Sequence, residues 1–223
     1  MLYAKLCYNE ISRGCTMKKL IAAETVLYLV FMGMDLFSVG NSTPVKFAAI
    51  LLLALSALDF REKTVSFALI LTMIADVFLL VLDRWYVAGI ACFLGVQILY
   101  AVRLQVKDGS RARILMFLLP IAAGLAVYTS YGFGLTEALA AAYITLFACN
   151  LVQAVGCAKR DPKRKWILFA AGLALFFCCD LCVGLHNMPG AGGEALQRFA
   201  NVAMWGFYLP GQVLIRTSAY TKN

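Results

Sequence analysis

The stretch ALFFCCDLCVGLH, residues 174–186, places Asp180 inside an apolar run that begins at Trp166. A second stretch, LILTMIADVFLLVL at residues 69–82, does the same with Asp76. Apolar runs of this length are typical of membrane-spanning helices, and an acid within such a helix costs about 2.5–3.5 kcal/mol on insertion scales. Because residues this costly usually mark a functional site, the two acids predict both a membrane protein and the place where its chemistry lies.

The composition supports a membrane protein over its whole length. Hydrophobic residues make up 62% of the 223-residue chain and charged residues 14%, whereas soluble domains are about 45–50% apolar and about 25% charged. Apolar segments recur from Leu20 to the C-terminus. We therefore predict an all-α, polytopic membrane helix bundle, an integral multi-pass protein that would lie in the inner membrane of a bacterium.

Breaks in the apolar runs predict about eight transmembrane helices. Their expected bounds are 20–37, 45–59, 65–82, 87–105, 113–131, 136–157, 166–186 and 197–216. With that count, all of the 20 Lys and Arg residues except Lys46, Arg84 and Arg198 fall on one side of the membrane. Because basic loops stay in the cytoplasm, we expect both termini there, with residues 1–19 as a cytoplasmic extension and 20–223 as a single transmembrane domain.

Neither the net charge nor the cysteines indicate a nucleic-acid partner or a bound metal. The basic loops account for the net charge of +8, so we expect no nucleic-acid partner. Most of the eight cysteines lie within predicted helices, where we expect free thiols that act as small apolar residues. Cys179, Cys182 and His186 share a helix face that could in principle hold a metal. With no matching ligand set elsewhere in the sequence, we expect no metal and no cofactor.

The two acids are expected at nearly the same depth in the membrane. At the rise of an α-helix, Asp76 lies about 18 Å from Thr64 and Asp180 about 21 Å from Trp166. Both fall near the same depth of a hydrocarbon core about 30 Å thick, on helices that run in the same direction, so the two carboxylates could face each other. The alternative is that each is a packing residue, protonated or hydrogen-bonded to a neighbouring helix.

Further polar residues lie in pairs on two other predicted helices. Gln97 and Tyr100 are three residues apart, and Tyr208 and Gln212 are four apart. Residues at these spacings share one face of a helix, so each pair could line the same interior as the acids. The alternative for each amide is an ordinary interhelical hydrogen bond. Further candidates of the same kind are Asn150 and Gln153.

Three stretches resemble the YhhN-like, lysoplasmalogenase family. ADVFLLVLDRWYVAGIACFLGVQILY, residues 75–100, is similar to the signature hairpin of that family: a small residue before Asp, a short loop with an aromatic and Gly, and a helix ending in Tyr. FFCCDLCVGLH (176–186) resembles its second acidic helix, and FYLPGQVLI (207–215) its last helix. The resemblance covers about residues 20–217 and implies an eight-helix membrane protein.

The chain departs from the family pattern at two positions. The family tends to have His where Gln97 stands, and Lys before Pro in the first loop, where this chain has Thr43 before Pro44 and Lys46 after it. Lys46 lies near the outer end of its predicted helix, so it is a candidate charge partner for the two acids.

The resemblance implies hydrolysis of the vinyl ether bond of a lysoplasmalogen to a fatty aldehyde and a glycerophospho-head group. Asp76 and Asp180 would be the catalytic acid and base, since two buried carboxyls in one site divide into a protonated and an ionised group. The expected substrate-binding residues are Lys46, Gln97, Tyr100, Tyr208 and Gln212. The lysophospholipid would enter from the bilayer, and no cofactor is needed. The alternatives are a small-molecule or proton-coupled transporter and a catalytically inactive lipid-binding member of the family.

Overall fold

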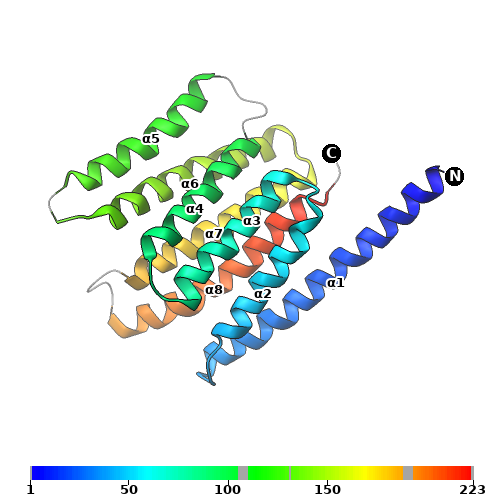
Figure 1. Ribbon diagram of the computed structural model, residues 1–223, viewed down its shortest axis with the longest axis horizontal. Helices are drawn as coiled ribbons and strands as arrows, with labels where there is room; N and C mark the ends of the chain where they lie inside the picture. The colour runs from blue at the N-terminus through cyan, green and yellow to red at the C-terminus, as the bar shows by residue number, and fades with distance from the viewer. Residues whose placement is uncertain (1, 105–109, 131, 188–192, 222–223) are drawn as a thin grey trace.

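The computed structural model describes residues 2–104, 110–130, 132–187 and 193–221. Within these ranges the protein is all-α, as predicted, and contains no strand. Eight α-helices are described (Figure 1): α1 (Leu2–Leu36), α2 (Thr43–Ser56), α3 (Lys63–Asp76), α4 (Tyr86–Leu104), α5 (Ser110–Tyr128), α6 (Leu135–Arg160), α7 (Arg164–Asn187) and α8 (Gly193–Ser218). The predicted division of the chain into eight helices is therefore confirmed.

Among the helix bounds that differ from the predicted ones are the start of α1, which begins at Leu2 rather than residue 20, and the ends of α2, α3 and α5, of which α5 ends at Tyr128 rather than residue 131. The predicted helix at 45–59 ends at Ser56 and continues as a 3-10 turn, η1 (Ala57–Asp59). The predicted helix at 65–82 changes at Asp76 into a π-turn, η2 (Val77–Val81), in which the Leu82 amide bonds back five residues to Val77. A π-turn adds a residue to one helical turn and is frequent at functional sites. An unbroken run of Val, Phe and Leu carries no sign of it.

Four helical segments in the described part of the chain are long and apolar enough to cross a membrane. They are 63–81, 86–104, 135–160 and 164–187. A fifth apolar segment, Ile114–Tyr128, is shorter. The fold and these segments are those of a membrane protein, whereas the cytoplasmic placement of both termini stays a prediction.

The helices form a bundle with α5 at one edge and α1 at the other (Figure 1). Helix α5 packs on α6, while α1 packs on α2 and α8. Helices α7 and α8 are the most closely packed pair, because Gly172 and Gly211 meet there. A Cβ atom added to Gly172 would lie 2.8 Å from the Gly211 carbonyl oxygen. Small residues let two membrane helices bring their backbones together in this way.

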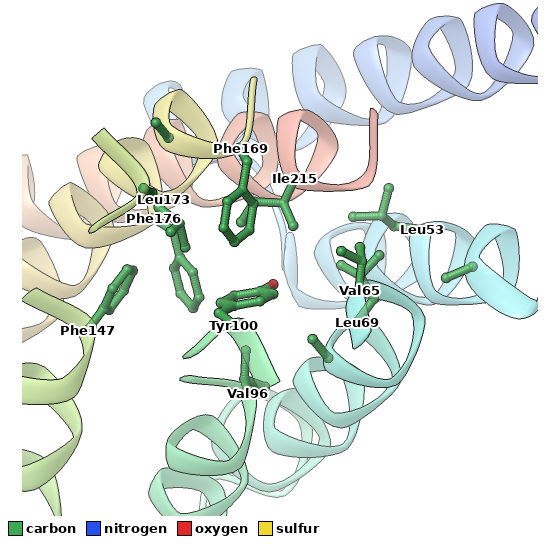
Figure 2. Close-up of a cluster of buried hydrophobic side chains, with 14 of the residues drawn as sticks. Leu53, Val65, Leu69, Val96, Tyr100, Phe147, Phe169, Leu173, Phe176 and Ile215 are labelled. Carbon is green, nitrogen blue, oxygen red and sulfur yellow. The ribbon is translucent and has the colours of Figure 1, made fainter. Parts of the chain in front are cut away.

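A cluster of buried apolar side chains fills the bundle between α2, α3, α4, α6, α7 and α8 (Figure 2). Tyr100 packs edge-on against Phe169 with ring centroids 5.4 Å apart, and Phe176 packs against Phe147 at 5.0 Å. In a bilayer these side chains leave lipid rather than water on folding. Their contribution is therefore close packing more than hydrophobic transfer.

At one end of the bundle, two arginines are buried among acidic and hydroxyl side chains. Arg103, near the end of α4, donates to both carboxylate oxygens of Glu62 at 2.5 and 2.7 Å, and to Ser218 at 2.8 Å. Such a two-point contact is the strong geometry for a guanidinium and a carboxylate. It joins the start of α3 to the ends of α4 and α8.

The second arginine, Arg216 of α8, is 0% exposed. It donates to the Ser56 hydroxyl at 3.1 Å, to Asp59 at 2.9 Å and to the Tyr220 hydroxyl at 3.0 Å. We call the seven residues of these two groups the arginine cluster: Ser56, Asp59, Glu62, Arg103, Arg216, Ser218 and Tyr220. Arg103 and Arg216 are among the basic residues that the sequence analysis placed on the cytoplasmic side, and the structure buries both side chains.

Candidate functional site: a carboxylate pair inside the bundle

Each of the two acids accepts a hydrogen bond from a tyrosine of another helix. Asp76, the last residue of α3, is 6% exposed, and its Oδ2 accepts the hydroxyl of Tyr208 from α8 at 2.5 Å. Asp180 of α7 accepts the hydroxyl of Tyr143 from α6. Four helices thus converge on two carboxyl groups, and each carboxyl has a neutral donor rather than a cation as its partner.

The two carboxyl groups lie near each other. Asp180 is close enough to Asp76 for its charge to act on that carboxyl, and both act on the hydroxyl of Tyr208. The thiol of Cys179 lies within the same range. The structure therefore brings Asp76, Asp180 and Tyr208 together, as the equal depth of the two acids suggested.

Aromatic rings pack around this carboxylate pair, by which we mean Asp76 and Asp180 with their two tyrosines. The Tyr208 ring meets Phe176 at 5.5 Å and Trp205 at 5.4 Å. On the other side, the Tyr143 ring meets Phe93 at 6.0 Å and Phe147 at 5.9 Å. Apolar walls lower the local dielectric, so charges and hydrogen bonds act more strongly on one another here than in water.

Gln97 reaches the carboxylate pair from α4. It is 0% exposed, and its Oε1 accepts a hydrogen bond of 2.9 Å from Nδ2 of Asn150 on α6. Its Nε2 lies beside the Tyr143 hydroxyl and makes no hydrogen bond to the protein. Gln153, the other amide candidate on α6, instead donates to the Met116 sulfur at 2.8 Å and is not part of this group.

Tyr100 lies about one turn after Gln97 on α4, and Gln212 about one turn after Tyr208 on α8. Tyr100 stands among the apolar side chains of Figure 2, near Arg103, and its hydroxyl has no partner. Gln212 is 1% exposed and both its amide atoms lack a partner. The hydroxyl of Thr72, one turn before Asp76, is also unpartnered. Buried polar atoms without a protein partner commonly bind water or a ligand.

The structure corrects the expected partner of Lys46. Its ammonium group pairs with Asp35 of α1 at 2.8 Å, rather than with Asp76 or Asp180. It also lies over the ring of Trp205, 4.7 Å from the centroid, and Trp205 in turn packs against Tyr208. Asp35 lies close to Lys46 because the end of α1 and the start of α2 join through a short loop. That loop brings a carboxylate nearer to Lys46 than either acid in the interior.

The cysteines and the histidine form no metal centre in the part of the chain that the structure describes. Cys92, Cys149, Cys157, Cys178, Cys179 and Cys182 take part in no disulfide bond. His186 is exposed and its ring nitrogen contacts the Gln197 carbonyl oxygen at 3.4 Å.

Tyr143 is the site residue that the sequence analysis missed. It lies seven residues before Asn150, which is two helical turns, so the two share a face of α6. A tyrosine and an amide at that spacing within an apolar helix is the signal that could have found it.

A helix bundle with membrane-length apolar segments and two acids in its interior defines a polytopic membrane protein. The chain belongs to the YhhN family, whose model matches residues 41–219. The match includes Asp76, Asp180 and every other polar residue placed at or near the site from α2 to α8, and it omits α1. Comparisons with curated proteins and with solved structures each gave no match.

Proposed function

We propose that the protein is a membrane-embedded hydrolase that cleaves the vinyl ether bond of lysoplasmalogens. The observation that supports this most is the carboxylate pair itself: a buried acid on α3 and a partly buried acid on α7, close enough for one charge to act on the other, each with a tyrosine hydroxyl as its partner. Two like charges so close together are unfavourable. One acid therefore holds a proton while the other is ionised, which is the arrangement that acid–base catalysis requires.

The chemistry of a vinyl ether suits such a pair. A carboxylic acid donates its proton to the alkene carbon distal to the ether oxygen, which leaves an oxocarbenium ion. Water adds to the carbon next to the oxygen and gives up a proton to the other carboxylate, which forms a hemiacetal. The hemiacetal then collapses to a fatty aldehyde and a glycerophospho alcohol, so the sum of the steps is the addition of one water and the cleavage of one C–O bond. No metal or redox cofactor takes part.

A single-chain lipid fits the surroundings of the pair. The aromatic rings of Phe176, Trp205 and Phe93 would contact the alkenyl chain. The unpartnered polar atoms of Gln97, Tyr100 and Gln212 would bind the glycerol or head group. We propose Lys46 as a further contact for the anionic head group, with its charge shared between that group and Asp35.

The direct test is hydrolysis by the purified protein in liposomes of defined composition. A 1-alkenyl lysophospholipid should release fatty aldehyde. The matched 1-alkyl and 1-acyl lysophospholipids should be left intact, because they lack the double bond that accepts the proton. Cleavage of the 1-acyl lipid with no aldehyde from the 1-alkenyl lipid would identify an ester hydrolase instead. Binding of all three lipids without any product would identify an inactive lipid-binding member.

Two interruptions in the helices support transport as a second candidate. The π-turn η2 follows Asp76 directly, and Pro210 lies within α8 two residues after Tyr208. Broken helices beside buried acids are also typical of transporters. In the same liposomes, transport would deplete lipid or a proton gradient from one side without releasing aldehyde.

A further inference from the structure

The contacts of Asn150 fix the orientation of two side-chain amides. One end of the Asn150 amide lies 2.8 Å from the main-chain carbonyl oxygen of Gln97 and 2.9 Å from the end of the Gln97 side chain. A carbonyl oxygen can only accept, so the Asn150 atom must be the donor Nδ2. The Gln97 atom that faces it must then be the acceptor Oε1. The Nε2 donor of Gln97 is therefore directed away from Asn150.

That donor is directed toward one carboxyl of the pair. Nε2 of Gln97 lies beside the hydroxyl of Tyr143, and that hydroxyl donates to Asp180. Asn150 thus holds the Gln97 amide with its donor end beside Tyr143, although that donor forms no hydrogen bond to the protein. The dipole of an amide held in this way acts more strongly on its neighbours in a low dielectric than in water.

The other carboxyl, that of Asp76, has no amide held in position near its tyrosine. Asp76 accepts the hydroxyl of Tyr208. The nearest amide on the same helix as Tyr208, that of Gln212, has no hydrogen-bond partner at either atom. Each acid therefore accepts a tyrosine hydroxyl, and the two acids differ in the amide that lies beyond that tyrosine.

We propose that Asp180 is the ionised base and Asp76 the protonated acid of the pair, and that Asn150 is the positioning residue that makes them differ by orienting Gln97. This assignment rests on the proposed ether hydrolysis. Donors directed toward the charged form of a carboxyl favour that form, and behind Asp180, but not behind Asp76, an amide held by another residue lies beside the bonded tyrosine. The negative charge on Asp180 then keeps the proton on its neighbour.

With this assignment, the reaction is a complete catalytic cycle. Asp76 gives its proton to the alkene carbon, and Asp180 takes one from the attacking water. At the hemiacetal stage Asp76 is ionised and Asp180 is protonated. Asp76 then takes the hydroxyl proton of the hemiacetal while Asp180 protonates the departing glycerol oxygen. The C–O bond breaks and both acids return to their first state.

The titratable groups that face one another at the pair lie on α3, α6, α7 and α8. They are Tyr143 of α6, Tyr208 of α8 and the thiol of Cys179 on α7, together with the two acids themselves. No cation pairs with either acid among the described residues, and the nearest buried ion pair, Lys46 with Asp35, lies behind Trp205. The difference between the two acids therefore depends on neutral donors.

Infrared spectroscopy tests the assignment without any substrate, because a protonated carboxyl has a C=O stretching band that a carboxylate lacks. Glu24 on α1 is a further buried carboxyl, 2% exposed and without a hydrogen-bond partner. Every protein in the series carries Glu24→Gln, so that this carboxyl does not contribute to the band. At neutral pH the parent should show the band, and Asp76→Asn should lose it. Asp180→Asn should retain it, although the band should then disappear at a lower pH than in the parent, because the charge that held the proton on Asp76 is gone. The assignment is overturned if the C=O band of the protonated carboxyl is lost only in Asp180→Asn. It is also overturned if both variants lose the band, or if neither does.

The role of Asn150 is tested by titrating the carboxylate band of Asp180. Asn150→Leu keeps the size of the side chain and releases the Gln97 amide, and Gln97→Met removes the donor. Each should raise the midpoint pH of that band by about half to one pH unit, which corresponds to part of one hydrogen bond to a charged group. Gln153→Leu is the control, because it removes an amide from the same helix that is bonded to Met116. A shift no larger than that of the control overturns the role of Asn150.

Activity then separates this inference from the proposed function. If the parent releases aldehyde, Asn150→Leu should move the acidic limb of the pH–rate profile upward by the same amount and leave the alkaline limb in place. If the parent releases none, ether hydrolysis is wrong, while the infrared bands still decide which acid holds the proton.

Discussion

The two buried polar groups of this bundle are built in opposite ways. In the arginine cluster, cations meet carboxylates directly, as Arg103 does with Glu62 and Arg216 with Asp59. In the carboxylate pair, two acids lie close enough for one charge to act on the other, and each accepts a tyrosine hydroxyl. The first arrangement cancels charge, whereas the second brings two acids together with no paired cation among the described residues.

The comparison separates a group that holds helices from a group that can do chemistry. A buried ion pair that keeps both partners bound stabilises one arrangement of its helices, and removing one partner costs several kcal/mol. Two neighbouring acids without a cation contribute little to stability, but their protonation states are easily exchanged. Substitutions in the two groups should therefore affect different measurements.

The largest effect is expected on turnover, from the carboxylate pair. Asp76→Asn or Asp180→Asn should lower the rate of aldehyde release by about 10²–10⁴-fold, the usual contribution of a general acid or base. The thermal midpoint should hold or rise, because Asn is nearly isosteric and costs less to bury than a charge. Asp83→Asn, at an exposed acid of the loop before α4, is the control. Parental turnover in both variants would show that the acids are packing or transport residues.

The next effect is expected on stability, from the arginine cluster. Arg216→Met removes a fully buried guanidinium and leaves Asp59 unpaired, which should lower the free energy of unfolding by about 2–4 kcal/mol. Arg61→Met removes a more exposed cation from the same carboxylate and should cost less than about 1 kcal/mol. Thermal unfolding in detergent measures both. Turnover per folded molecule should not change, and a loss of turnover without loss of stability would contradict the separation.

A smaller effect on turnover is expected from the tyrosines of the pair. Tyr143→Phe or Tyr208→Phe removes one hydroxyl donor to a carboxyl, a bond worth about 1.5–3 kcal/mol when the acceptor is charged. Turnover should fall about 10- to 100-fold. Tyr28→Phe is the control, because that hydroxyl donates to the Gly206 carbonyl oxygen, at 3.3 Å. If Tyr143→Phe and Tyr208→Phe behave like Tyr28→Phe, the hydroxyls do not support the chemistry.

The smallest expected effect is on the pH dependence of stability, through Asp59 in the turn beyond α2. Burial alone would raise the pKa of this carboxyl, but hydrogen bonds from Tyr220 and Arg216 outweigh it and hold the pKa below its ordinary value. A carboxyl with a lowered pKa stabilises the folded state above the ordinary value of about 3.9, and this contribution is lost as the pH falls through the lower folded value. The gap in thermal midpoint between the parent and Asp59→Asn should therefore shrink on acidification below about pH 4. A gap that grows on acidification would contradict the direction of the shift.

The fold was predictable because its signal is repeated along the chain. Apolar runs broken by short polar loops locate all eight helices, and Asp76 and Asp180 stand out because a charge is costly in such a run. Equal depth on helices that run in the same direction was enough to place these two acids together, since helix rise is constant.

The partners of these residues were not predictable from the sequence. Tyr143 is one aromatic among many in apolar helices, and only packing shows that its hydroxyl meets Asp180. Arg103 and Arg216 lie at helix ends, where a basic residue is usually in contact with solvent, so their burial depends on the positions of Glu62 and Asp59. Asp35, Asp76 and Asp180 were each a conceivable partner for Lys46, and loop geometry selects Asp35.

The glycine contact between α7 and α8 has a consequence for hydrogen exchange. With the backbones of Gly172 and Gly211 touching, no side chain and no room for water separates the two helices at that level. Their amide hydrogens should therefore be among the last in the protein to exchange with solvent deuterium. The amides of α5, which packs on α6 at the edge of the bundle, should exchange earlier. Asp180 and Tyr208 are thus attached to the slowest-exchanging part of the chain, one on each side of its tightest contact.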